Sequence, residues 1–217
     1  PPASCTDSVG SDIMIRLLVL RHGPTAWNQA GRLQGRTDVP LAVDAQAAIA
    51  GWALPAEVAH WIWYTSPLSR CQATAAAMGA TPALETALIE MAWGDWEGQR
   101  PEDLRADPAS GFTAQETRGL DLTPPGGESP RSTAERLHPW LARLHQDTVA
   151  VTHKGVIRAL FHLATGWGFM GKPPGKVICG TAQLFERDAS GMLRLVQADQ
   201  PLAEPWTWPG RAAGPVP

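Results

Sequence analysis

Two short apolar runs in this chain each lead directly into a histidine. The run at residues 15–20 is followed by Arg21 and His22, and the run at residues 149–152 is followed by His153. Runs this short and this apolar are typical of strands buried on both faces of a parallel sheet. In open α/β sheets, ligands bind at the carboxyl ends of such strands. We therefore expect two imidazoles and a guanidinium at one sheet edge, a combination that indicates phosphate chemistry.

Predicted strands and helices alternate along the chain. Strands are expected at 13–20, 60–65, 83–89 and 148–152, and helices at 42–53, 68–78, 130–146 and 155–165. Two last strands, at 177–186 and 192–199, are separated by a turn at 188–191 that is typical of a hairpin. This alternation predicts an α/β fold of three layers, α/β/α, with a mostly parallel central sheet that ends in an antiparallel element.

Two Ser-Pro pairs mark predicted helix starts. Ser66-Pro67 and Ser129-Pro130 each offer a serine as N-cap and a proline for the first helical position. Gly79 is a typical residue just past a helix end. The first of these helices is expected to begin where the strand at 60–65 ends, which places Arg70 in its first turn.

A length of 217 residues favours a single domain, expected over residues 13–200. Residues 1–12 are rich in Pro, Ser and Asp and are expected to be disordered or processed. Residues 201–217 form a Pro- and Trp-rich tail that is expected to lie over the surface. The connection at residues 91–128 is long for a compact domain, and such connections are usually functional. We interpret it as a lid or substrate loop.

Charge and composition argue against several classes of partner. The formal net charge is −3 and no run of Lys or Arg occurs, so nucleic-acid binding is not expected. No stretch has the roughly 18 consecutive apolar residues of a membrane span, and the first residues do not resemble a secretory signal. The three cysteines show no metal-binding or disulfide spacing, which is typical of a reducing compartment. We therefore expect a cytoplasmic protein without a membrane partner.

His22 is the leading candidate for a catalytic residue. A neutral imidazole can attack phosphorus without a metal, and Arg21 beside it offers a planar fork for two phosphoryl oxygens. Arg70 has a charge that opposes the dipole of its own helix, which makes sense where a phosphate lies between them. His153 supplies a second imidazole that can bind the phosphoryl group.

Glu90 is the candidate proton donor. The leaving alkoxide of a phosphate ester needs a proton, and a partly buried carboxyl beside a phosphate has a raised pKa and can supply one. Asp95 and Glu97 are rival candidates, although their Gly-rich surroundings favour roles in turns and caps. A zinc site is the alternative chemistry for the two histidines. No His-x-x-x-His or Cys-x-x-Cys spacing supports it, and Arg21 beside His22 would repel a cation, so no metal is expected.

Taken together, these segments resemble branch 1 of the histidine phosphatase superfamily, the phosphoglycerate-mutase-like proteins. The similarity runs from about residue 15 to residue 186, with the motifs in the family's order. It comprises Leu-Arg-His-Gly-x-Thr-x-Trp-Asn at 20–28, Gly-Arg-Leu-Gln-Gly at 31–35, Asp-x-Pro-Leu at 38–41, Ser-Pro-Leu-x-Arg-x-x-x-Thr-Ala at 66–75, Glu90 with Gly-Asp-Trp-Glu-Gly at 94–98, Gly-Gly-Glu-Ser at 126–129 and Thr-His-x-Gly-Val-Ile-Arg at 152–158.

The resemblance implies a phosphoglycerate-mutase-like fold and a phosphohistidine mechanism that needs no cofactor. His22 would attack phosphorus, while Arg21, Arg70 and His153 hold the equatorial oxygens in the transition state. Glu90 would protonate the leaving group and then activate water to cleave the phosphoenzyme.

Three further positions bear on substrate binding. Asn28 matches a family position near the phosphate and is an additional candidate donor to the substrate. Pro24 stands where many relatives have Glu or another polar residue, and Lys154 stands where Gly is frequent. These two departures leave the proposed catalytic groups in place and would alter the rim of the pocket.

The segment between Glu90 and Gly126 looks shorter than in the glycolytic mutases. This favours a phosphatase for a small phosphorylated metabolite, such as a sugar phosphate, a phosphoglycerate or α-ribazole phosphate. A phosphoglycerate mutase is the alternative function. A catalytically idle binding module is a third, which the filled catalytic positions disfavour. A homodimer is compatible with the sequence, but no feature requires one.

Overall fold

The computed structural model describes residues 14–203 and Trp206, and it contains one six-stranded sheet. The strands are β1 (Ile15–Arg21), β2 (Ile62–Thr65), β3 (Ala83–Leu84), β4 (Thr148–Thr152), β5 (Thr181–Arg187) and β6 (Leu193–Pro201). Their order is β3-β2-β4-β1-β5-β6. The first four are parallel to one another, and β5 and β6 add an antiparallel edge, which confirms the predicted mixed, mostly parallel sheet.

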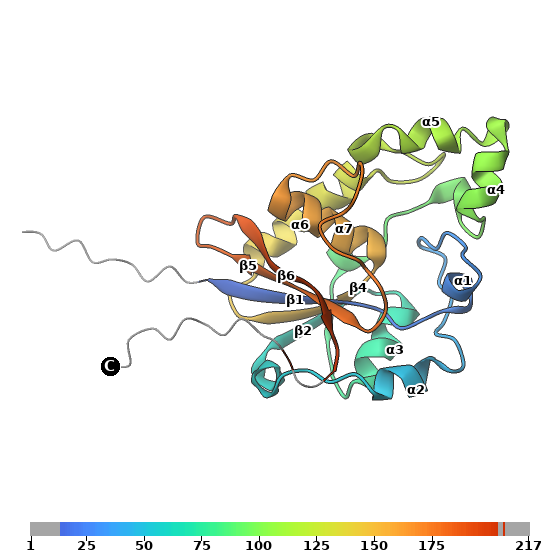
Figure 1. Cartoon of the computed structure of the whole chain (residues 1–217). Coiled ribbons are helices and arrows are strands. Elements are labelled where there is room, and N and C mark those ends of the chain that lie inside the picture. The colour runs from blue at the N-terminus through green and yellow to red at the C-terminus, as the bar shows by residue number, and fades with distance from the viewer. Residues whose placement is uncertain (1–13, 204–205, 207–217) are drawn as a thin grey trace, which may run out of the picture.

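Helices cover both faces of the sheet. The seven α-helices in the described part of the chain are α1 (Ala26–Gln29), α2 (Ala45–Ala50), α3 (Ser69–Ala77), α4 (Pro101–Ala106), α5 (Phe112–Glu116), α6 (Pro130–Arg143) and α7 (Lys154–Thr165). Helices α6 and α7 lie on one face, α2 and α3 lie on the other, and α4 and α5 extend on the same side of the molecule as α1 (Figure 1). The three-layer α/β/α architecture is therefore confirmed.

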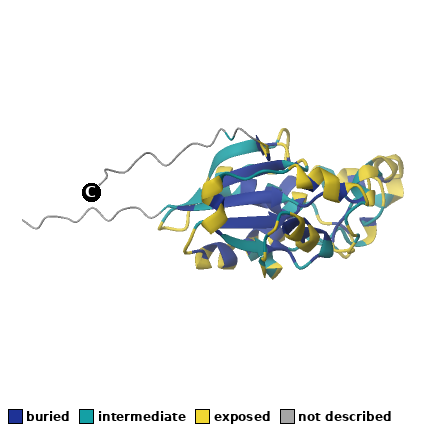
Figure 2. Cartoon of the chain, turned by 90° about the horizontal axis from the view of Figure 1, so that it is seen from below, coloured by how far each residue is buried: buried dark blue, intermediate teal, exposed yellow. Residues whose placement is uncertain are grey.

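The apolar core lies on both faces of the sheet, as its alternating side chains require. Leu17 and Val19 of β1 pack with the residues of α6 and α7, including the fully buried Trp140. Leu18 and Leu20 point to the opposite face. The strands are buried between outer helical surfaces that are exposed (Figure 2). The continuous apolar run in the sequence therefore correctly predicted a central strand.

The predicted strand at 83–89 is wrong beyond its first two residues. Only Ala83 and Leu84 join the sheet, and a 3-10 helix follows at Thr86–Leu88. The side chain of Glu85 accepts a hydrogen bond from the Ala87 amide at 2.9 Å. The guanidinium of Arg136 in α6 donates to the carbonyl oxygens of Ala87 and Ile89. Because side chains satisfy these backbone groups, the segment does not need a strand partner.

The predicted N-cap of α3 is also wrong. Ser66 does not cap this helix, which begins at Ser69 after Leu68. Asp38 takes over the cap, since its carboxylate accepts hydrogen bonds from the Ser69 amide at 3.0 and 3.1 Å and from the Ser69 hydroxyl at 2.9 Å. Ser129 does cap α6 as predicted, and accepts a hydrogen bond from the Ser132 amide at 3.0 Å.

Other predicted boundaries shift by a few residues. The helix predicted at 42–53 is shorter (α2), and the helix predicted to reach residue 146 ends at Arg143. The short helix α1 lies in a part of the chain where no helix was predicted. Strand β6 runs on to Pro201, and Leu202 after it is buried, so the predicted tail begins later. The indole of Trp206 donates to the Ala53 carbonyl at 2.9 Å. The predictions for residues 1–12 and for most of the tail lie outside the described residues.

The connection at 91–128 contains a small apolar cluster of its own. Trp96, Leu104 and Phe112 are buried together, with the Trp96 and Phe112 rings 4.8 Å apart. This segment holds α4 and α5, together with three short 3-10 helices at Gly94–Trp96, Pro108–Ser110 and Gly119–Asp121. None of the helices in the described part of the chain is long and apolar enough to cross a membrane.

Candidate active site

The two motif histidines follow neighbouring strands. β1 and β4 pair in parallel with Arg21 opposite Thr152, so His22 and His153 leave the sheet side by side. Their ring centroids are 5.1 Å apart and both side chains are buried. The structure therefore places both imidazoles at the carboxyl edge of the sheet, where the sequence predicted them.

His22 is held in one tautomer. Its Nδ1 lies 2.7 Å from the carbonyl oxygen of Gly23. A carbonyl can only accept, so Nδ1 carries the proton and Nε2 carries the lone pair of the neutral ring. Burial, followed by the charges of Arg21 and Arg70, holds the pKa of His22 well below its ordinary value. A buried neutral imidazole with its Nε2 lone pair available is suited to nucleophilic attack.

His153 is fixed by two side chains. Arg70 Nε donates to its Nδ1 at 3.3 Å, and its Nε2 lies 2.7 Å from the hydroxyl of Ser66. Because Arg70 can only donate, His153 must carry its proton on Nε2 and donate it to Ser66. Burial first, and then the nearby charges of His22 and Arg70, hold its pKa well below the ordinary value. Ser66 thus orients His153 instead of capping α3.

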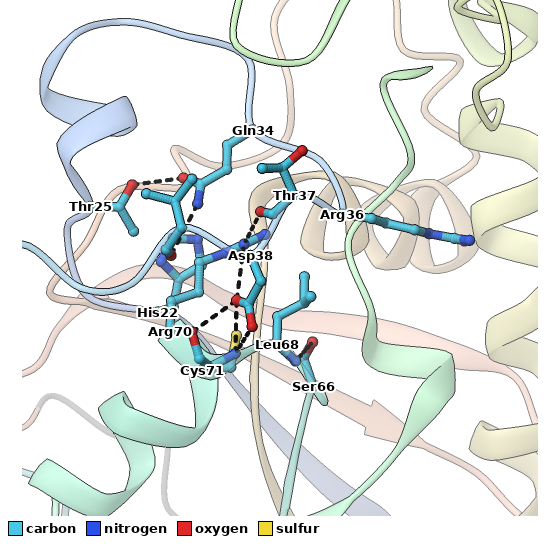
Figure 3. Close-up of polar contacts among 12 residues, drawn as sticks. His22, Thr25, Gln34, Arg36, Thr37, Asp38, Ser66, Leu68, Arg70 and Cys71 are labelled. Atoms are coloured by element: carbon cyan, nitrogen blue, oxygen red, sulfur yellow. Dashed lines mark hydrogen bonds and ion pairs between the residues drawn. The ribbon is translucent and has the colours of Figure 1, made fainter. Parts of the chain in front are cut away.

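Arg70 is fully buried and is enclosed by the loop that follows α1. Its Nη2 donates to the Gly35 carbonyl at 2.7 Å and its Nη1 donates to the Thr37 carbonyl at 3.1 Å. Asp38 lies 4.0 Å from Nη1 of Arg70 and caps α3 at Ser69, the residue before Arg70 (Figure 3). These contacts fix the guanidinium beside His153 and His22, and burial lowers its pKa from the ordinary value.

Arg21 keeps part of its guanidinium unpaired. Its Nη1 donates to the Val177 carbonyl at 3.2 Å, while its buried Nε has no hydrogen-bond partner. Buried donors are normally satisfied, and the exceptions need an explanation. A phosphoryl oxygen next to His22 would supply the missing acceptor.

Glu90 lies beside the start of α7. Its Oε1 accepts from the Met91 amide at 2.9 Å and its Oε2 accepts from the Gly155 amide at 3.2 Å. Burial raises the pKa of this carboxyl, although the two amides and the charge of Arg70 act in the opposite direction. A Cβ on Gly155 would lie 2.4 Å from Oε1 of Glu90, so a larger residue there would displace this carboxylate.

The rival carboxylates have other positions. Asp95 is exposed. Glu97 accepts hydrogen bonds from the amides of Arg36 and Thr37, each at 2.8 Å, and from the Trp93 amide at 3.2 Å. Burial alone would raise the pKa of Glu97, but these donors and the Thr37 hydroxyl hold it below its ordinary value. Glu97 therefore connects two loops and is poorly suited to give up a proton.

Asn28 is engaged in its own turn. Its side chain accepts from the Thr25 amide at 3.3 Å and donates to Gln34 Oε1 at 3.2 Å. Thr25 donates to the same Gln34 oxygen at 2.7 Å (Figure 3). In the described residues, no group of three or more His, Cys, Asp or Glu side chains is placed to hold a metal ion.

Comparisons with known proteins identify the family of this chain. A family model described as the histidine phosphatase superfamily (branch 1) matches residues 17–182. The chain belongs to this superfamily. The match covers the strands that carry both histidines and the segment that contains Arg70 and Glu90. Membership implies a phosphorylated small molecule as the substrate.

Relatives with known names include two bacterial proteins named 2,3-bisphosphoglycerate-dependent phosphoglycerate mutase. The one from Brucella canis is 36% identical over 171 residues, which are 70% of this chain and 83% of the relative. The one from Azorhizobium caulinodans is 34% identical over 165 residues, 68% of this chain and 80% of the relative.

Solved structures are also similar. A phosphoglycerate mutase from Thermus thermophilus is 31% identical with a TM-score of 0.63, covering 84% of this chain and 97% of that one. A protein described as mycobacterial hydrolase 1 is 25% identical with a TM-score of 0.67, covering 87% of this chain and 100% of that one. Both confirm the phosphoglycerate-mutase-like fold.

The sequence did not predict the roles of several residues at the site. Ser66 was interpreted as an N-cap, but it contacts His153 instead. Asp38 was only part of a motif, but it caps α3. Arg136, which holds the segment before Glu90, carried no motif signal. Ser66 could have been found, because its motif lies at the end of a strand adjacent to β4.

The two buried histidines predict an acid-sensitive fold. Because their pKa values are lowered in the folded chain, their contribution to stability is complete above the unfolded value of about 6.5 and is lost as the pH falls below it. Each contributes a slope of up to about 1.4 kcal/mol per pH unit. We expect urea unfolding between pH 7.5 and 5 to show this loss. His153→Gln should reduce the slope, whereas His138→Gln at an exposed position should not; equal slopes in all three proteins would contradict the assignment.

Proposed function

We propose that this chain is a phosphoryl-transfer enzyme that attacks small phosphomonoesters with Nε2 of His22. The observation that supports this most directly is the hydrogen bond from His22 Nδ1 to the Gly23 carbonyl, which leaves the lone pair on Nε2. Arg21 supplies an unpaired donor beside this point, and Arg70 is held next to it together with His153. Such preorganised donors stabilise the charge that spreads over the equatorial oxygens in the transition state.

Glu90 is proposed to move the proton in both halves of the reaction. As the bond between phosphorus and the ester oxygen breaks, the Glu90 carboxyl gives its proton to the leaving alkoxide, and a phosphorus–nitrogen bond forms at His22. In the second half, the carboxylate takes a proton from the acceptor hydroxyl while the phosphorus–nitrogen bond breaks. The raised pKa of Glu90 suits the first of these steps.

The favoured acceptor is a hydroxyl of a phosphoglycerate, which makes the chain a phosphoglycerate mutase. The names of the two relatives at 34% and 36% identity support this acceptor. Their matched 165 and 171 residues are 80% and 83% of their length, so they are about as long as this chain. A short segment after Glu90 therefore does not argue for hydrolysis as the sequence analysis supposed.

Hydrolysis is the second candidate. The similarity to a protein described as a hydrolase, over 87% of this chain, supports it. The two reactions share the phosphohistidine and differ only in whether water or a sugar-acid hydroxyl accepts the phosphoryl group.

Phosphorus NMR of one mixture separates these functions. The chain is incubated with 3-phosphoglycerate, a trace of 2,3-bisphosphoglycerate and excess chelator. We expect 2-phosphoglycerate to form faster than inorganic phosphate, and to form in the presence of the chelator. Dominant phosphate release would instead assign hydrolysis. Loss of turnover in chelator would contradict the metal-free mechanism, and failure with this substrate and with a panel of sugar phosphates would leave only a binding role.

A further inference from the structure

Three cations lie near the candidate active site, and the charge of Glu90 is the one acidic influence on two of them, Lys154 and Arg158, in the part of the chain that the structure describes. Lys154 is the first residue of α7 and directly follows His153. Arg158 lies four residues further along the same helix, on the same face. Arg21 pairs with Thr152 on the neighbouring strand. Among the residues that the structure describes, ten ion pairs are present, and none of them involves Arg21, Lys154 or Arg158.

This arrangement is unfavourable in the absence of an anion. A lysine at the first position of a helix opposes the helix dipole. Like charges four residues apart on a helix repel each other. Partial desolvation of Lys154 lowers its pKa most, the charges of Arg158 and Arg21 lower it further, and the charge of Glu90 acts in the opposite direction.

The position of Lys154 sets it apart from the groups that surround phosphorus. His153 before it is fully buried, and Gly155 after it donates to Glu90, yet Lys154 itself is exposed. Lys154 is therefore an exposed residue that directly follows His153 in the chain. Arg158 is half-buried, with its guanidinium 5.8 Å from the centroid of the Trp167 ring. A ligand with one charge at phosphorus and a second charge several bonds away would reach both regions.

We propose that Lys154 and Arg158 bind a second anionic group of the substrate, a carboxylate or a phosphate, in addition to the phosphoryl group that reacts with His22. This inference rests on the proposed function, and it makes Lys154 a determinant of specificity. The exposed Lys154 supplies a mobile point charge, and Arg158 supplies a planar donor held against Trp167.

Binding measurements on a chain that cannot turn over test the proposal. In the His22→Ala background, calorimetry compares 3-phosphoglycerate with glycerol 3-phosphate, which has a hydroxymethyl group in place of the carboxylate. Propane-1,3-diol bisphosphate tests a phosphate as the second anion. We expect the ligands with a second anionic group to bind more tightly than glycerol 3-phosphate. Lys154→Met should weaken the binding of those ligands by about tenfold and leave the binding of glycerol 3-phosphate unchanged. Lys154→Arg should retain the preference.

The controls separate this proposal from general electrostatics. Arg194 lies opposite Glu186 of β5, which in turn lies opposite Arg16, at the end of the sheet away from the two histidines. Arg194→Met also removes one positive charge and should leave all three affinities unchanged. Equal weakening of every ligand by Lys154→Met would place Lys154 at the reacting phosphoryl group and overturn the proposal. The absence of any preference for a second anion would also overturn it. A failure of all three ligands to bind would instead contradict the proposed function itself.

Discussion

Replacing His22 with alanine is expected to abolish the phosphoenzyme and to lower kcat by roughly 10⁴-fold to 10⁶-fold, the range found when a nucleophile is removed. His22 is the buried imidazole whose Nδ1 is committed to the Gly23 carbonyl. Arg70 and His153 keep their mutual contact without it, so the loss would be chemical rather than structural. Acid-labile phosphate bound to the protein after rapid quenching is the direct measurement.

Two comparisons make the His22 prediction decisive. His138→Ala, at an exposed position of α6, should retain normal turnover and normal labelling. Far-ultraviolet circular dichroism should show that both variants are folded. A phosphoenzyme that still forms in His22→Ala would assign the nucleophile to another residue, with His153 the next to examine.

The position of His22 and His153 could be predicted because it depends on local patterns. Each histidine follows an apolar run, and the order of parallel strands brings such run ends to one edge. The same reasoning placed Arg70 at the start of a helix after β2. These inferences need only the periodicity of the sequence and the rule that governs ligand sites in parallel sheets.

The surroundings of Glu90 and Ser66 could not be predicted in this way. The apolar run before Glu90 also fits a strand. In the structure it forms a 3-10 helix, and the guanidinium of Arg136, more than 40 residues later in the chain, donates hydrogen bonds to its carbonyl groups. Ser66 has the local signature of an N-cap, but Asp38 caps α3 from 31 residues earlier in the chain. In both places the hydrogen bond comes from a side chain that is distant in the sequence. Reasoning from local sequence patterns expects the partner among residues nearby in the chain.

Replacing Glu90 with glutamine is expected to lower kcat by about 10²-fold to 10⁴-fold for alkyl phosphates, the range for loss of general acid–base catalysis. The reason is that an alkoxide cannot leave without a proton. The reduction should be much smaller for p-nitrophenyl phosphate, whose leaving group is stable as an anion. Pre-steady-state kinetics with the two substrates measures this difference. Equal reductions for both would contradict a role in protonating the leaving group.

The pH dependence gives a second test of Glu90. Because burial raises its pKa, the carboxyl remains protonated above the ordinary range, and the first half-reaction should decline only as the pH rises through that raised value. Glu90→Gln should remove this alkaline decline in phosphoenzyme formation. Gly155→Ala provides an independent perturbation, since its Cβ would displace Oε1 without changing the charge of the carboxyl. If Glu90 acts through its position as well as its proton, Gly155→Ala should lower kcat for alkyl phosphates more than for p-nitrophenyl phosphate, as Glu90→Gln does.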